Sequence, residues 1–123
     1  MTTEALDHLK EAIVHELDRS LQHTYHQRLS EVLVDLRVHY APVSSAPRPD
    51  EIASLMLHRG VLDRPSEPAL AELRETFERW EHGLLGICVR CGKEIPMPVL
   101  GRHPTAARCP SCDRQTSSPL HSF

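Results

Sequence analysis

All four cysteines of the chain lie in one stretch near its C-terminal end, as two pairs of the form C-x2-C. They are Cys88 with Cys91 and Cys109 with Cys112. Two such pairs at this separation are typical of a tetrahedral four-cysteine zinc site, in which each pair forms a tight turn with both sulfurs pointing inward. Four thiolates without cluster-type spacing favour zinc over iron and leave no open position for a catalytic water. We therefore expect one structural zinc ion bound by all four cysteines.

The segment between the two pairs predicts a short irregular hairpin that returns the second pair to the first. It contains Ile95, Val99 and Leu100 as its apolar part, and it is interrupted by prolines and glycines. A lobe this small buries little apolar area, so metal binding is expected to supply much of its folding free energy. We place this predicted zinc finger at residues 83–114.

The elements that must position the finger are predicted to be helices. Residues 3–37 contain no Gly or Pro, and their apolar residues recur every three or four positions, which indicates one long amphipathic helix. Because most of the gaps are four, the stripe winds around the helix, and we expect a bend or break near residues 20–24 or a change of packing partner along its length. The stripe consists of Leu6, Leu9, Ile13, Leu17, Leu21, Tyr25, Leu29, Leu33 and Leu36.

Two shorter helices are predicted after a proline-rich loop at residues 40–49. The first covers about 50–59 with Asp50 as its N-cap, and the second covers about 67–82 with Ser66 as its N-cap. The second carries a heptad-spaced seam that should pack lengthwise on the first long helix. The seam consists of Leu70, Leu73, Phe77, Trp80 and Leu84.

The predicted fold is therefore mostly α with a small zinc ribbon or finger. Residues 1–82 form a helical hairpin or short bundle, in which the long N-terminal helix packs on the return helix. Residues 83–114 form the four-cysteine finger, and residues 115–123 form a flexible tail without apolar periodicity.

Composition and motifs exclude several functional classes. Lys and Arg number 14 against 17 Asp and Glu, without a basic run, so sequence-specific or tight nonspecific nucleic-acid binding is not expected. The sequence has no P-loop, G-x-S-x-G or H-E-x-x-H motif, so we do not expect an enzyme. The histidine pairs His8/His15 and His23/His26 are expected on solvated helix faces. It also lacks a long apolar run or a secretory signal, which predicts a cytoplasmic protein without a membrane partner.

The residues around the cysteines resemble those of a known protein family. "RETFERWEHGLLGICVRCGKEI", Leu100, "PTA" and "CPSC" fall in register with the DksA/TraR family of bacterial RNA polymerase-binding proteins, over about residues 70–113. The resemblance implies a helical hairpin that projects from a zinc-finger globule into the secondary channel of RNA polymerase and regulates transcription. The family's tip signature, Asp-x-x-Asp-x-Ala, is degenerate here, which leaves Asp50 as the expected tip contact with polymerase.

The alarmone ppGpp acts at the protein–polymerase interface in such proteins. Glu72, His103 and Asp113 stand where longer family members place basic residues for ppGpp, so its binding is not expected here. Two alternatives to polymerase regulation stay open at this point. One is a structural or adaptor protein whose zinc lobe supports a helical protein-binding surface, which an arm too short or bent for a channel would favour. The other is a redox or zinc-reservoir protein, which would have labile zinc and exposed thiols.

Overall fold

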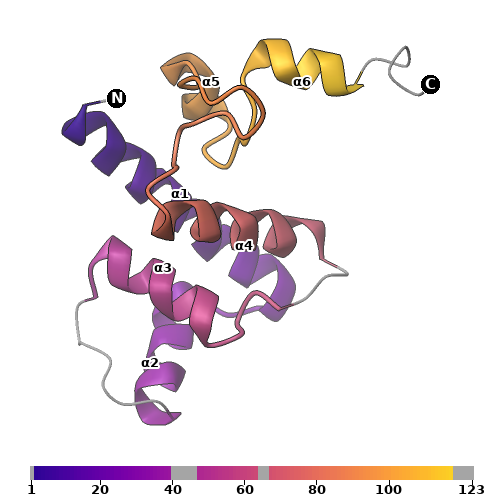
Figure 1. Ribbon diagram of the computed structural model, residues 1–123. Coiled ribbons are helices and arrows are strands. Elements are labelled where there is room, and N and C mark those ends of the chain that lie inside the picture. The colour runs from indigo at the N-terminus through magenta and orange to yellow at the C-terminus, as the bar shows by residue number, and fades with distance from the viewer. Residues whose placement is uncertain (1, 40–46, 64–66, 118–123) are drawn as a thin grey trace.

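The computed structural model describes residues 2–39, 47–63 and 67–117 (Figure 1). Over these ranges the chain is mostly helical, as predicted, and its only pairing of extended backbone is an isolated antiparallel bridge between Ile87 and Glu94. The part of the chain around the cysteines is therefore not a ribbon of strands. The helices are α1 (Thr3–Tyr25), α2 (Leu29–His39), α3 (Pro49–His58), α4 (Pro68–Glu81), α5 (Met97–Arg102) and α6 (Pro110–Ser117).

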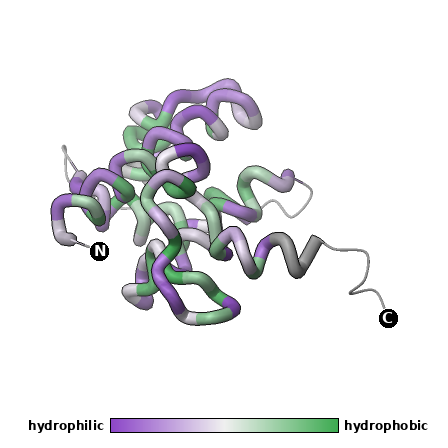
Figure 2. Tube along the Cα trace, turned by 90° about the horizontal axis from the view of Figure 1, so that it is seen from above, coloured by the Kyte–Doolittle hydropathy of each residue, from purple (hydrophilic) through white to green (hydrophobic). Residues whose placement is uncertain are grey.

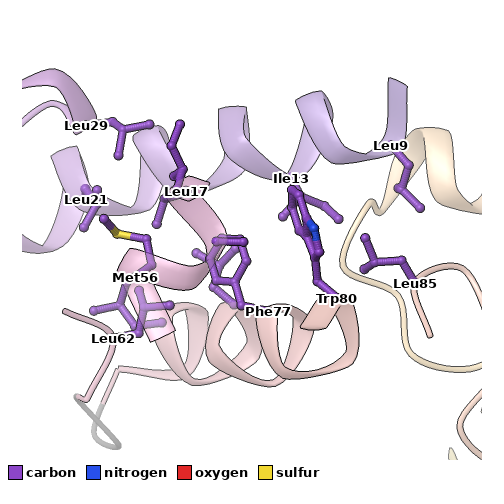
Figure 3. Close-up of a cluster of buried hydrophobic side chains, with 14 of the residues drawn as sticks. Leu9, Ile13, Leu17, Leu21, Leu29, Met56, Leu62, Phe77, Trp80 and Leu85 are labelled. Atoms are coloured by element: carbon purple, nitrogen blue, oxygen red, sulfur yellow. The ribbon is translucent and has the colours of Figure 1, made fainter. Parts of the chain in front are cut away.

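Helices α1, α3 and α4 pack against one another as a small bundle, with α5 and α6 at one end of the molecule and α2 at the other (Figure 1). The buried face of α1 points toward the buried faces of α3 and α4 (Figure 3). Full burial of one large apolar side chain contributes about 1.5–3 kcal/mol, so burial along this seam stabilises the bundle strongly. Its fully buried members are Ile13, Leu17, Leu21, Met56, Leu70 and Phe77, and Leu62 from the turn after α3 is also fully buried.

Hydrophobic segments gather toward the middle of the molecule, and hydrophilic segments occupy most of the outer helical turns (Figure 2). This distribution follows from the apolar periodicity of α1 and α4, which places one stripe of each helix inward. Among the residues that the structure describes, none of the helices combines the length and the apolar character needed to cross a membrane.

The predicted single helix over 3–37 is wrong, because α1 ends at Tyr25 and α2 begins at Leu29. His26 adopts the left-handed conformation with φ 56°, and its backbone N–H donates to the carbonyl of Gln22, which ends α1. The carboxylate of Asp18 then accepts a hydrogen bond of 2.7 Å from the backbone N–H of Leu29, at the first turn of α2. The break lies slightly beyond the predicted region 20–24, and it lets Leu29, Leu33 and Leu36 stay buried although the stripe winds.

The two following helices lie close to their predicted bounds, but their N-caps differ. Arg48 occupies the N-cap position of α3 without a side-chain cap, and Asp50 lies inside the first turn. Glu67 occupies the N-cap position of α4. The predicted cap Ser66 and most of the predicted loop 40–49 lie outside the described residues.

The predicted seam of α4 is wrong at its last member. Leu84 is 48% exposed, whereas Leu85 is buried. The reason is a Schellman turn after α4, in which Gly83 has φ 70°, the N–H of Leu84 donates to the carbonyl of Arg79 and the N–H of Gly83 donates to that of Trp80. The turn ends the helical period, so the next apolar residue to face the core is Leu85, which lies beyond Trp80 near Leu9 (Figure 3).

The C-terminal segment also departs from prediction. Residues 115–117 belong to helix α6 and not to a flexible tail. Its first turn contains Cys112, so the second cysteine pair stands at the start of a helix. The remaining predicted tail, 118–123, lies outside the described residues.

Candidate metal centre

The four predicted cysteine ligands converge on one point. Their sulfur atoms all lie within 4.8 Å of one another, and the Sγ atoms of Cys91 and Cys109 are 3.7 Å apart. A tetrahedral zinc ion with Zn–S bonds of about 2.3 Å requires its sulfurs to be about 3.8 Å apart. The observed cluster therefore fits a four-coordinate thiolate metal site, with one ligand from each cysteine.

Backbone hydrogen bonds hold both cysteine pairs in the required turns. The N–H of Gly92 donates to the carbonyl of Cys88 at 3.0 Å, and Gly92 has φ 75°, a conformation that a side chain would strain. The N–H of Asp113 donates to the carbonyl of Cys109 at 2.9 Å. Between the pairs, the N–H of Val89 donates to the carbonyl of Ala107 at 2.8 Å and brings the two turns together.

The surroundings of the sulfurs prepare some of them to lose their protons. Burial raises the pKa of the Cys88 thiol, but backbone donors from Cys109, Cys91 and Arg90 outweigh it and lower that pKa to about 6. Backbone and side-chain hydrogen bonds from Cys112 lower the pKa of Cys109. Hydrogen bonding to Cys109, followed by burial, raises the pKa of Cys112 to about 12. Metal ions bind cysteine as the thiolate, so metal binding at this cluster would release the thiol protons.

The exposure of the four ligands is uneven. Cys88 and Cys112 are buried, Cys109 is intermediate and Cys91 is exposed. All four positions of a tetrahedral metal would be filled by sulfur, so the donor set leaves none for water or substrate. Such a centre can hold the surrounding chain together, and its donor set is that of a structural site.

The metal lobe, which we define as residues 83–113, docks on α4 through a polar joint. Thr105 is 8% exposed, and its hydroxyl donates to Glu72 Oε1 at 2.6 Å. His103 Nε2 lies 2.9 Å from the same oxygen. Arg79 Nη2 donates to the carbonyl of Thr105 at 3.3 Å. Two residues of α4 therefore fix the segment between the cysteine pairs.

Sequence reasoning missed this joint. In the sequence, Glu72 and His103 stand out as replacements for basic family residues, and Thr105 as a member of the "PTA" motif. The structure brings these three side chains together. They line a hollow in the surface between α4 and the metal lobe, and Asp113 lines it as well. The separation of 33 positions between Glu72 and Thr105 leaves no local signal for the contact.

Asp50, the predicted tip residue, links three helices of the bundle. Its Oδ1 accepts from the indole N–H of Trp80 at 2.7 Å and lies 2.9 Å from Lys10 Nζ. Hydrogen bonding to Lys10, and then to Trp80, lowers the pKa of this carboxyl. Because Trp80 belongs to the last turn of α4, Asp50 lies beside the helix end that leads into the metal lobe. It does not stand at the free end of a projecting arm.

Comparison with known proteins gives this chain no established function. No family model matches it, and no solved structure matches it. An uncharacterised protein of Aquifex aeolicus (strain VF5) is 38% identical to it over 73 residues, which is 56% of this chain. The chain spans about half the length of that relative, 50% of which is covered.

Proposed function

We propose that this chain is a zinc-dependent regulator of transcription that binds bacterial RNA polymerase directly, without reading DNA sequence. The observation that carries the proposal is the burial of residues shared with the DksA/TraR pattern. Ile95, Leu100 and Thr105 are buried, and they lie between the two halves of the four-cysteine cluster. The pattern therefore coincides with the residues that a metal lobe of this kind needs for folding and docking.

Zinc is the metal that suits this site best. Four thiolates in a closed tetrahedral set are the usual donors for structural zinc, and the 3.7 Å separation of the Cys91 and Cys109 sulfurs agrees with zinc–sulfur bond lengths. When bound, the ion would supply cross-linking of the two cysteine turns, and the chain's own hydrogen bonds would orient the lobe on α4. In this proposal the metal acts on folding and on the shape of the binding surface.

A second candidate is an adaptor for a different protein partner. It is favoured by the bundle, because α3 packs on both α1 and α4 and because Asp50 is tied to Lys10 and Trp80. The part of the chain that the structure describes thus contains no free two-helix arm to enter a channel. An adaptor would use the surface of this bundle on another protein partner.

The test is direct binding of the full-length, zinc-loaded chain to purified core polymerase, combined with recovery of partners from a native cytoplasmic extract. Binding at micromolar concentration, together with a changed transcript yield at a stringent promoter, supports the polymerase proposal. The matched control is the same protein after removal and then restoration of zinc. Absence of polymerase binding at tens of micromolar refutes the proposal, and reproducible recovery of another protein then favours the adaptor.

A further inference from the structure

We propose that the cleft between α4 and the metal lobe docks a short peptide segment of a protein partner in which an acidic residue stands next to a large hydrophobic one. The cleft consists of two adjoining hollows of about 650 Å³ and 370 Å³. The two hollows share Glu75, Arg79, Ala107 and Arg108, so they form one continuous surface. The inference deepens the proposed function, because it rests on the partner being a protein and names the chemistry that recognises it.

Three arginines in the larger hollow offer donors for an acidic group. Arg102 and Arg108 are exposed, and neither forms an ion pair with any residue that the structure describes. Arg79 is partly buried and donates only to neutral oxygens, the hydroxyl of Thr76 at 3.4 Å and the carbonyl of Thr105 at 3.3 Å. A guanidinium presents paired donors that match a carboxylate, and such charge-assisted bonds are stronger than neutral ones. The hollow therefore has unused capacity to bind a carboxylate.

The acidic residues in the same hollow decide which kind of anion fits. Glu72, Glu75 and Asp113 line it together with the arginines, so the formal charges of arginines and carboxylates balance. A multiply charged phosphate group would meet these carboxylates as well as the arginines and gain little net attraction. Glu72 is already engaged by His103 and Thr105, whereas Arg102 and Arg108 form no ion pair among the described residues, so a singly charged carboxylate can pair with either arginine. Charge complementarity thus favours an acidic side chain of a protein over a free polyphosphate.

The smaller hollow supplies the hydrophobic half of the recognition. Leu84 and Val89 line it and are 48% and 56% exposed, which is unusual for large apolar residues in this chain. They lie next to Arg79 and Arg108, which line the same hollow. Protein interfaces commonly combine arginine with an apolar centre, where the apolar contact gives affinity and the charges give orientation. A leucine-like side chain beside the acidic one would cover Leu84 and Val89.

The metal centre controls the shape of this surface. Val89 lies between Cys88 and Cys91, and Arg108 immediately precedes Cys109. Loss of the metal would release both cysteine turns and separate the two halves of the cleft. We therefore expect peptide binding to require the metal-loaded protein, although the peptide does not touch the metal.

The experiment measures binding of labelled eight-residue peptides to the metal-loaded, full-length chain by fluorescence anisotropy. The probe alternates Glu and Leu, and the two control peptides alternate Glu with Ser and Lys with Leu. We expect the Glu–Leu peptide to bind at least about tenfold more tightly than either control, because both hollows are used only by that peptide.

The double variant Arg102→Glu/Arg108→Glu should lose about tenfold or more of this affinity. Lys93→Glu is the matched control, because it reverses a charge on the same lobe outside both hollows.

Each outcome bears on the docking surface separately from polymerase binding. Equal binding of the Glu–Leu and Glu–Ser peptides, no binding at about 1 mM, or equal losses in the double variant and Lys93→Glu would overturn the proposal. Inorganic tripolyphosphate that binds more tightly than the peptide would also overturn it, since the cleft would then be an anion site. Peptide binding without polymerase binding supports this surface and refutes the polymerase partner. If the peptide does not bind, and polymerase binds the double variant as tightly as the unchanged protein, the docking surface is refuted and the polymerase partner is supported. Circular dichroism of each variant checks that these surface substitutions leave the helical fold intact.

Discussion

Replacing Thr105 by valine should loosen the metal lobe from α4 while leaving the cysteine cluster in place. Valine has nearly the shape of threonine, so the buried site keeps its volume, but the hydroxyl that donates to Glu72 Oε1 at 2.6 Å is lost. A hydrogen bond to a charged group contributes about 1.5–3 kcal/mol. Because the side chain of Glu72 is 45% exposed and water can replace part of the bond, we expect the free energy of unfolding to fall by about 1–1.5 kcal/mol. This corresponds to a decrease in Tm of about 3–6 °C for a domain of this size.

The assay combines denaturant unfolding at a buffered zinc concentration with hydrogen exchange of the amides in the lobe. Exchange should accelerate at residues 95–107 and remain unchanged in α1. A double-mutant cycle with Glu72→Gln isolates the contact, and we expect a coupling energy of about 1 kcal/mol. Thr3→Val, at an exposed position, is the matched control and should change stability by less than about 0.5 kcal/mol. A loss at Thr105 no larger than at Thr3, or a coupling energy near zero, would show that the polar joint does not hold the lobe.

Four further substitutions test the bundle. Leu85→Ser should destabilise the protein by about 2–4 kcal/mol and Leu84→Ser by less than about 0.5 kcal/mol, as measured by urea unfolding; equal effects would contradict the turn after α4. Phe77→Ala, at a fully buried site, should cost about 3–5 kcal/mol and leave the protein largely unfolded near 37 °C by circular dichroism, which a small shift in Tm would contradict. Asp50→Asn should cost about 0.5 kcal/mol at pH 7, because the Asp50 side chain is 70% exposed and its ion pair with Lys10 is screened. Because the pKa of Asp50 is lowered in the folded protein, this stabilisation is present above the ordinary Asp pKa of about 3.9 and disappears as pH falls through the lowered value; an undiminished difference at pH 2 would refute the assignment.

The helices of the bundle could be predicted because their signals are local. An apolar stripe every three or four residues marks α1 and α4, and Gly83 marks the end of α4. The break after α1 could not be placed, because residues 26–28 include neither Gly nor Pro. It depends on His26 in a left-handed conformation and on capping of Leu29 by Asp18, 11 positions earlier. Such a contact forms only once the chain has already turned.

The ligand set was predictable for a similar reason, and its surroundings were not. The spacing of the cysteine pairs fixes which sulfurs can meet, and the structure brings those four together. The docking of the lobe depends on Thr105 and Glu72, which the fold joins across 33 positions. The location of Asp50 was missed because family resemblance suggests an extended arm, whereas its bonds to Lys10 and Trp80 require the three helices to be packed together.

X-ray absorption spectroscopy of the purified protein, combined with metal analysis, tests the central claim most directly. The claim is that all four cysteines bind one structural metal ion and leave no position open. We predict one zinc per chain, with a first shell fitted by four sulfur atoms at about 2.3 Å. A shell with fewer than four sulfurs, a nitrogen or oxygen ligand in their place, or protein that folds fully without bound metal would contradict the claim.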